Sequence, residues 1–368
     1  MNRVRTYRAG GFRAPAIAGV LLLLVTLVSA CGSSSGKASQ ATSGVTVRLL
    51  THDAFAASKS VLADFTKQTG IKVKVLRQGD AGAMVNAAIL TRDDPEADAL
   101  YGIDNTFLSR ALDHQLFEPR NYTGLDLLIP QARASFASAL KYVVPTDWGD
   151  VCFNYDIAWF RNHHLAAPTT LDDLVKPAYK GLTVVENPAT SSTGNAMLVS
   201  SVAKFGDKGA MTWWHTLLHK NGGEAVDSWD TAYESDFTDG GGSGTRPIVL
   251  SYASSPPADI VYSDGKKTTT DVGVVMDGCF RQYEFAGVLH NAAHPAAAQI
   301  LVQYLLSKEF QQDMPSQMFV FPTRTGAAIP AVFQKWAPPA PHPYLPDYRT
   351  IGAHRDQWID EWTKDALG

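Results

Sequence analysis

The segment VTVRLLTHDAF (residues 45–55) has the alternation of a β-strand and ends in a polar turn. It is followed by KSVLADFTKQTG (59–70), whose apolar residues have helical spacing and which ends at a glycine. A second alternating segment, IKVKVLRQG (71–79), comes next. Strand, helix and strand in this order predict an α/β lobe with a largely parallel sheet.

The same alternation continues along the chain. AMVNAAILTR (83–92) predicts a helix, and ADALYGIDN (97–105) predicts a strand with a polar end. The polar turns THDAF, QGDAG and YGIDN therefore all follow strand ends. Ligands of open α/β sheets bind outside the carboxyl ends of the strands, so these turns are predicted to line one crevice.

Later segments predict further strands and helices. Residues 151–155 and the short LTVVENP segment (182–188) have strand patterns, and PIVLSYASSP (247–256) predicts a buried strand that carries Tyr252 to its end. A long amphipathic helix is predicted from Pro295. The length of 368 residues also favours two lobes over one.

The N-terminus has the features of a secretory signal. Four arginines precede the apolar run AIAGVLLLLVTLV (16–28), which is too short for a comfortable membrane span. We therefore predict a signal peptide at 1–30. VSAC (28–31) resembles the lipobox at which bacteria lipidate the cysteine, which predicts lipid on Cys31 and a flexible tether at 31–44. The alternative is a plain signal peptide with an incidental cysteine.

The composition is that of a globular protein, with 45% hydrophobic and 18% charged residues. The net charge of −4 argues against nucleic acid as the main partner, because nucleic acid favours a basic face. Beyond Cys31 the chain has Cys152 and Cys279. In an oxidising compartment they form either a disulfide or two buried thiols, and the sequence leaves both open.

Seven motifs together resemble the thiamine-binding subfamily of bacterial ABC-importer solute-binding proteins, over nearly all of the mature chain. In chain order they are THDAFA (51–56), ADALYGIDN (97–105), VPTDWGDVCFNYD (144–156), ENPATSSTG (186–194), DSWDTAY (227–233), VLSYASSP (249–256) and FVFPT (319–323). The resemblance implies an α/β, two-lobed periplasmic-binding-protein-like fold. Each lobe would have a central mixed sheet flanked by helices, and a hinge of strands would join the two lobes. The first lobe would comprise residues 45–143 and 284–325, and the second lobe residues 144–283 and 326–368.

The resemblance also implies a site for thiamine or its phosphate. The predicted ligand-binding residues are His52, Asp53, Asp80, Asp147, Ser191, Ser192, Thr193, Trp229, Tyr233, Tyr252 and Phe319. Trp229, Tyr252 and Phe319 would stack against the flat rings, since a thiazolium cation gains from aromatic faces. Tyr233, one helical turn from Trp229, would extend or support the same wall.

Charged and hydroxyl groups complete the implied site. Asp53 and Asp147 would supply negative charge to the cation or hydrogen-bond acceptors to the amino group, although Asp147 could equally cap a turn. Asp80 and the turn at 191–194 would contact the hydroxyethyl arm of thiamine or the phosphate attached to it. Hydroxyls at a helix start form an anion site or only cap the helix, and the sequence leaves both open.

Two positions depart from the subfamily. His52 stands where a tyrosine is common, and Lys59 where a tryptophan is common. These changes keep other cargoes open, namely polyamine, iron or sugar. A thiaminase-like transferase using Cys152 is a further alternative, although the expectation is a protein without catalysis.

The sequence predicts no cofactor and no metal. His215 and His219 have the i,i+4 spacing of metal ligands but come with no third ligand in the sequence. The predicted partners are the ligand, an ABC permease with its ATPase, and the membrane through the lipid. We expect a monomer at the cell surface or in the periplasm.

Overall fold

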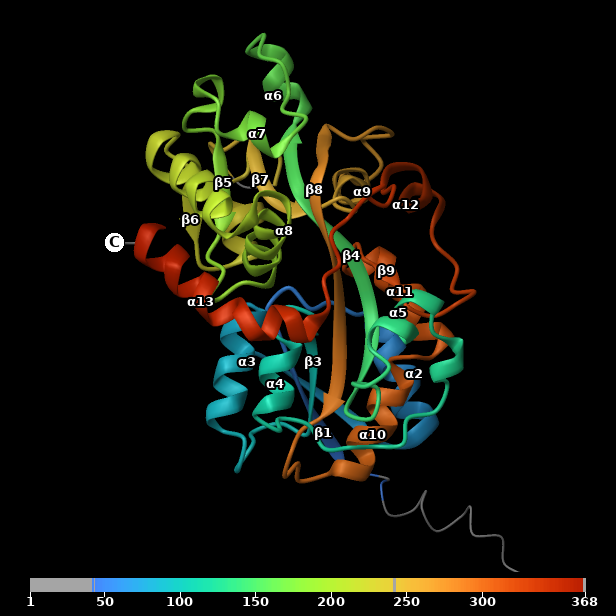
Figure 1. Cartoon of the computed structure of the whole chain (residues 1–368). Helices are drawn as coiled ribbons and strands as arrows, with labels where there is room; N and C mark the ends of the chain where they lie inside the picture. Colours follow the sequence, from blue (N-terminus) through green and yellow to red (C-terminus); the bar gives the residue numbers. More distant parts are fainter. Residues whose placement is uncertain (1–41, 43, 241–242, 367–368) are drawn as a thin grey trace, which may run out of the picture.

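The computed structural model describes residues 42, 44–240 and 243–366. The predicted signal peptide, the lipidation site at Cys31 and most of the tether lie outside these residues. Within them the chain forms two lobes, one above the other, joined by two long strands (Figure 1). No helix in the described part of the chain has the length and apolar character needed to cross a membrane.

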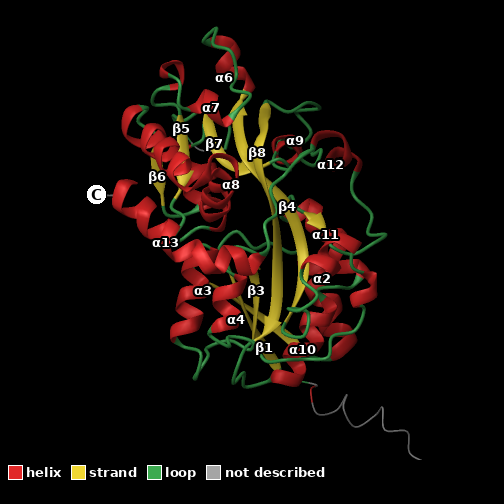
Figure 2. Cartoon of the chain, viewed as in Figure 1, coloured by secondary structure: helices red, strands yellow, loops and turns green. Residues whose placement is uncertain are grey.

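The first lobe has a sheet covered by helices on both faces (Figure 2). Its strands are β1 (Thr46–Thr51), β2 (Lys72–Arg77) and β3 (Ala99–Asp104). Its helices are α2 (Lys59–Thr69), α3 (Ala81–Leu90), α4 (Leu108–Asp113), α5 (Pro130–Ser135), α10 (Pro295–Tyr304) and α11 (Lys308–Gln317). The strand β1 pairs in parallel with both β2 and β3, so their carboxyl ends meet at one edge.

The second lobe repeats this plan. Its strands are β5 (Thr183–Glu186), β6 (Glu224–Val226) and β7 (Ile248–Tyr252). Its helices are α6 (Ile157–Asn162), α7 (Leu171–Leu174), α8 (Ser192–His215) and α9 (Pro256–Val261). Two π-helical segments, η3 (Thr216–Lys220) and η4 (Thr231–Asp236), lie on either side of β6 in the sequence.

Two long antiparallel strands join the lobes. β4 (Val143–Asp156) pairs with β8 (Val272–Val288) from Val143 opposite Gly287 to Asp156 opposite Val272. The strand order is β2-β1-β3-β8-β4-β7-β5-β6, so both strands belong to both lobes. The short β9 (Phe321–Pro322) adds to β4. The predicted fold class is confirmed, with parallel and antiparallel pairs in each lobe.

The C-terminal helix α13 (Tyr348–Ala366) runs from the first lobe to the second (Figure 1). Tyr348 packs in a cluster of the first lobe, whereas Trp358 and Trp362 pack in the core of the second. The helix α12 (Ala331–Trp336) precedes it. The lobe boundaries expected from the sequence stay a prediction, because this helix contacts both lobes.

One expected helix differs in extent. The helix predicted from Pro295 ends at Tyr304, and α11 starts anew because the Ser307 hydroxyl accepts from the Phe310 N–H. The long element α8 consists of two helical pieces, because Gly206 has a non-helical backbone conformation (φ 70°, ψ 165°).

The two cysteines lie side by side on the joining strands. Cys152 on β4 and Cys279 on β8 form a disulfide, with Cα atoms 4.7 Å apart, in the second-lobe part of these strands. Both are fully buried, in contact with Ala253 and Ala340. The bond therefore fastens the two strands to each other from inside the lobe.

Candidate functional site

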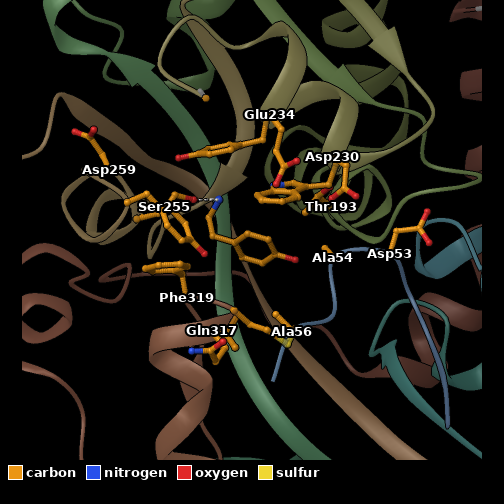
Figure 3. A pocket seen from close by; sticks show the side chains of 18 of the residues that line it. Asp53, Ala54, Ala56, Thr193, Asp230, Glu234, Ser255, Asp259, Gln317 and Phe319 are labelled. Atoms are coloured by element: carbon orange, nitrogen blue, oxygen red, sulfur yellow. Dashed lines mark hydrogen bonds between the residues drawn. The ribbon is translucent and has the colours of Figure 1, made fainter. Parts of the chain in front are cut away.

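A cavity of about 850 Å³ lies between the lobes. Its walls include the turn after β1, the end of β7, the segment η4 and the turn after α11. Figure 3 shows Asp230 and Glu234 above the cavity and Phe319 and Gln317 below it. This volume is within the usual range for small-molecule sites, about 300–1,000 Å³.

The stretch SWDTAYESDF provides one wall. Trp229 and Tyr233 are stacked, with ring centroids 4.9 Å apart and an interplanar angle of 12°. The Trp229 indole N–H donates to the Ser251 hydroxyl (2.9 Å), which fixes the ring. Tyr233 is only 8% exposed. Trp229 therefore presents the flat face of its indole to the cavity. Tyr233 supports the indole from behind, and only a small part of its own side chain reaches the cavity.

Two further aromatic residues from the predicted set line the cavity. Tyr252 ends β7, and its hydroxyl accepts from the Gln282 side-chain amide (3.1 Å). Phe319 packs edge-to-face on Tyr262, with centroids 5.5 Å apart. Phe319 also has a φ of 54°, a left-handed conformation uncommon for a bulky residue. Such strained positions occur mainly where the surroundings fix a functional side chain.

The cavity wall carries many more carboxylates than basic side chains. Its carboxylates are Asp53, Asp80, Asp230, Glu234, Asp239, Asp259 and Glu284. Of its two lysines, Lys267 is bound to Asp259 (2.6 Å) and Asp271 (3.3 Å), which leaves Lys266. Burial, with the charges of Glu234 and Asp80, raises the pKa of Asp230 to about 6. Such a surplus of negative charge favours a cationic ligand.

Asp80 connects the lobes at one side of the cavity. It caps α3 in the first lobe, and its Oδ2 accepts from the Trp229 backbone N–H in the second (2.9 Å). The Ala83 N–H donates to the Thr190 carbonyl (3.1 Å), again between lobes. The structure is therefore closed at this side, and Asp80 positions the aromatic wall.

His52 occupies the floor of the cavity. Its ring covers Gly102, where an added Cβ would lie 2.2 Å from the imidazole and where φ is 95°. The glycine of the YGIDN motif thus makes room for this ring. His52 Nε2 lies 3.4 Å from Glu284 Oε2. Burial lowers the pKa of His52, but the charge and hydrogen bond of Glu284, together with the charges of Asp80 and Asp147, outweigh burial and raise it to about 9.

We predict that this pair makes stability depend on pH. A histidine whose pKa rises from about 6.5 in the unfolded chain stabilises the fold fully below that pH, and the contribution is lost as pH rises to about 9. Because each pH unit is worth about 1.4 kcal/mol, the fall should reach about 3 kcal/mol. Urea unfolding of the parent protein and of His52→Gln between these pH values measures it. An equal fall in both proteins would contradict the role of His52.

The predicted anion turn is present but largely closed. Ser191 is fully buried at the start of α8, and its hydroxyl contacts that of Thr193 (3.0 Å) rather than capping a backbone N–H. Thr193 donates to the buried carboxyl of Glu186 (2.8 Å), whose pKa is raised well above its usual value by burial. Ser192 and Thr193 line the cavity, whereas Ser191 does not.

Asp147 is likewise outside the cavity wall. It is 1% exposed, and its carboxylate accepts from the hydroxyls of Tyr101 and Thr146. It lies opposite Glu284 on the joining strands, and burial raises its pKa well above the usual value. The sequence pattern could not show which hydroxyls cover it. Lys59 is exposed at the start of α2 and contributes no charge to the cavity wall.

The cavity thus brings together nine of the eleven predicted residues from both lobes. Sequence reasoning missed Asp230 and Glu234, each of which directly follows one of the two stacked aromatic residues. Neither forms an ion pair within the described residues. An acidic residue next to each aromatic residue of SWDTAYESDF was a signal that could have identified them.

Gly82 allows the lobes to approach each other. A Cβ at this position would lie 2.7 Å from the Thr190 carbonyl oxygen of the other lobe and 2.8 Å from Phe107. Overpacking of this kind costs about 1–3 kcal/mol. We therefore expect Gly82→Ala to weaken ligand binding about tenfold by disfavouring closure. Calorimetry against Gly209→Ala, a helical glycine away from the cavity, measures this loss. Equal affinities would contradict the role of Gly82.

Comparison with known proteins agrees with this geometry. The family described as bacterial extracellular solute-binding proteins matches residues 60–340. The chain therefore belongs to this family. A thiamine-binding periplasmic protein of Salmonella typhimurium is 25% identical over 319 residues, covering 85% of this chain and 91% of the relative.

Two further relatives carry the same name in their descriptions. The thiamine-binding periplasmic protein of Haemophilus influenzae is 28% identical over 319 residues, covering 84% of this chain and 88% of the relative. A solved structure described as a periplasmic thiamin binding protein is 25% identical, with a TM-score of 0.76 and coverage of 87% of this chain and 96% of that chain. The resemblance predicted from the sequence motifs is confirmed.

Proposed function

We propose that this protein captures thiamine, or one of its phosphate esters, in the cavity between its lobes. The observation that supports this most strongly is a stacked aromatic pair beside an acidic cluster, Trp229 and Tyr233 with Asp230 and Glu234. A flat cation gains from both, because aromatic faces and carboxylates attract positive charge. The names of the relatives point to the same ligand.

The electrostatics favour the unphosphorylated form. Any phosphate at the start of α8 would lie near the carboxylate of Asp80, while Lys266 is the one cavity lysine without a carboxylate partner among the described residues. Like charges disfavour an anion there. The Ser192 hydroxyl can still donate a hydrogen bond to a hydroxyethyl arm, whereas the Thr193 hydroxyl, which donates to Glu186, can accept one. We therefore propose that thiamine binds more tightly than its phosphates.

The proposed role is transport rather than catalysis. The protein would be held at the outer face of the membrane by lipid on Cys31, as a monomer, and would deliver its ligand to an ABC permease driven by a cytoplasmic ATPase. A thiaminase-like mechanism would need a thiolate, and Cys152 is bonded to Cys279 in the structure. Binding and closure require no covalent step.

Calorimetric titration with a panel of solutes tests the proposal. The panel is thiamine, its monophosphate, its diphosphate, spermidine and ferric citrate. We expect thiamine to bind most tightly, with a Kd below about 1 μM, and to be recovered intact. Tighter spermidine binding would show a cation site that does not use the flat rings. If none of these solutes binds, the family assignment would stand, but the proposal that the ligand is thiamine would be contradicted.

A variant at the start of α8 tests whether this helix start binds the phosphate of a thiamine ester. Ser192→Ala removes a hydroxyl that lines the cavity at the start of α8. If this helix start binds phosphate, the variant should weaken the monophosphate more than thiamine. Equal losses would show that the hydroxyl serves the uncharged arm, as proposed here.

A further inference from the structure

The end of α13 brings a carboxylate to the two histidines that the cavity does not use. His215 ends α8, and His219 lies one turn later in η3. Asp365, from the last turn of α13, completes a group whose three ligand atoms lie within 4.8 Å of one another. Figure 1 shows the C-terminal end of α13 on the outer side of the second lobe.

The local backbone explains the arrangement of the histidines. η3 continues α8 as a π-helical segment, a form that is rare and frequent at functional sites. The two imidazole rings have centroids 4.9 Å apart. His215 Nδ1 lies 2.8 Å from Asp365 Oδ1, and His219 Nε2 lies 2.5 Å from the Asp365 carbonyl oxygen. Both imidazoles thus contact Asp365, one at its carboxylate and one at its backbone carbonyl, and the three potential ligand atoms lie within 4.8 Å of one another.

Asp365 has unused binding capacity. Its Oδ2 is buried and has no hydrogen-bond partner among the described residues. An unsatisfied buried carboxylate oxygen is costly unless a donor or a cation meets it. Its other oxygen faces His215, whose side chain is 45% exposed, so an ion can enter from solvent.

We propose that His215, His219 and Asp365 bind a divalent transition metal ion of the Zn²⁺ class. Two imidazoles and a carboxylate suit Zn²⁺, which keeps a fourth position for water. Bonds of about 2.0–2.1 Å to a tetrahedral ion place ligand atoms about 3.4 Å apart. Half-exposed side chains can make this adjustment. The ion would fasten the end of α13 to α8.

The site has a structural consequence that is independent of the solute. α13 contacts both lobes, since its Tyr348 carbonyl accepts from the Ser109 hydroxyl of the first lobe and its Trp358 indole N–H donates to Asp207 of the second. A metal ion bound to Asp365, His215 and His219 would fix the last turn of α13 to the second lobe. The metal would therefore stabilise the helix without entering the solute cavity.

Titration of Zn²⁺ into the tag-free, chelator-treated protein tests the proposal. We expect one site with a Kd on the order of 1 μM, and a melting temperature that rises with Zn²⁺ concentration. Loss of an outer-shell partner costs about 10–100-fold in metal affinity, so His219→Ala, which removes a ligand, should cost about 100-fold. Co²⁺ absorption in the visible range reports the coordination directly.

A matched histidine provides the control. His163 is exposed and hydrogen-bonded to a helix carbonyl, as His219 is, but it directly follows α6 and does not belong to the proposed metal site. His163→Ala should bind Zn²⁺ like the parent protein, and Asp365→Asn should weaken binding as His219→Ala does. Equal affinity in His219→Ala and the parent, or no saturable site in the parent, would overturn the proposal. Neither result would bear on thiamine binding.

Discussion

Trp229→Ala should weaken thiamine binding at least about tenfold while leaving the fold intact. A desolvated cation over an indole gains about 2 kcal/mol, and the variant loses this face together with its stack on Tyr233. Ser251 and Asp80, which hold the indole and its backbone, should stay in place. Calorimetry with thiamine measures the loss, and urea unfolding measures stability.

A tryptophan outside the cavity provides the control. Trp336 is half-buried on α12 and carries Lys335 over its ring. Trp336→Ala should bind thiamine as the parent protein does. If Trp229→Ala also keeps its affinity but loses stability, the indole belongs to the core and the ligand lies elsewhere.

Replacement of both Cys152 and Cys279 by alanine should lower the free energy of unfolding by about 3–5 kcal/mol. The bond closes a loop of 127 residues, and long loops gain most from a crosslink because the unfolded chain is restricted. Alanine avoids a buried hydroxyl at these fully buried positions. Chemical denaturation of the oxidised parent and the double variant gives the difference.

Reduction distinguishes the bond from the packing around it. Dithiothreitol should lower the stability of the parent protein toward that of the variant and leave the variant unchanged. Thiamine affinity should survive in the variant under conditions where it is folded, since neither sulfur lines the cavity. Equal stability of the parent with and without reductant would show that the pair is not bonded.

The alternation of strands and helices was enough to predict the fold class. VTVRLLTHDAF became β1 with His52 and Asp53 at its end, as the pattern of 45–55 indicated. The motifs also placed Trp229 and Tyr252 in one cavity. These features depend on local periodicity and on the rule that strand ends meet at one edge, both of which a sequence contains.

Other features depend on contacts between distant segments. β4 was expected to start near Val151, because TDWGD has the composition of a turn. Pairing with β8 extends the strand back to Val143 and places Asp147 beneath Tyr101. Nothing in the local sequence shows which hydroxyls cover that carboxylate. The same holds for Asp365, which is 146 residues from His219.

A crystal structure of the protein grown with thiamine tests the central claim most directly. We predict electron density for the ligand between the lobes, with a ring stacked on Trp229 and the thiazolium facing Asp230 and Glu234. The Asp80 contact to the Trp229 N–H should be retained. An empty cavity in thiamine-saturated crystals, or thiamine bound elsewhere, would contradict the account.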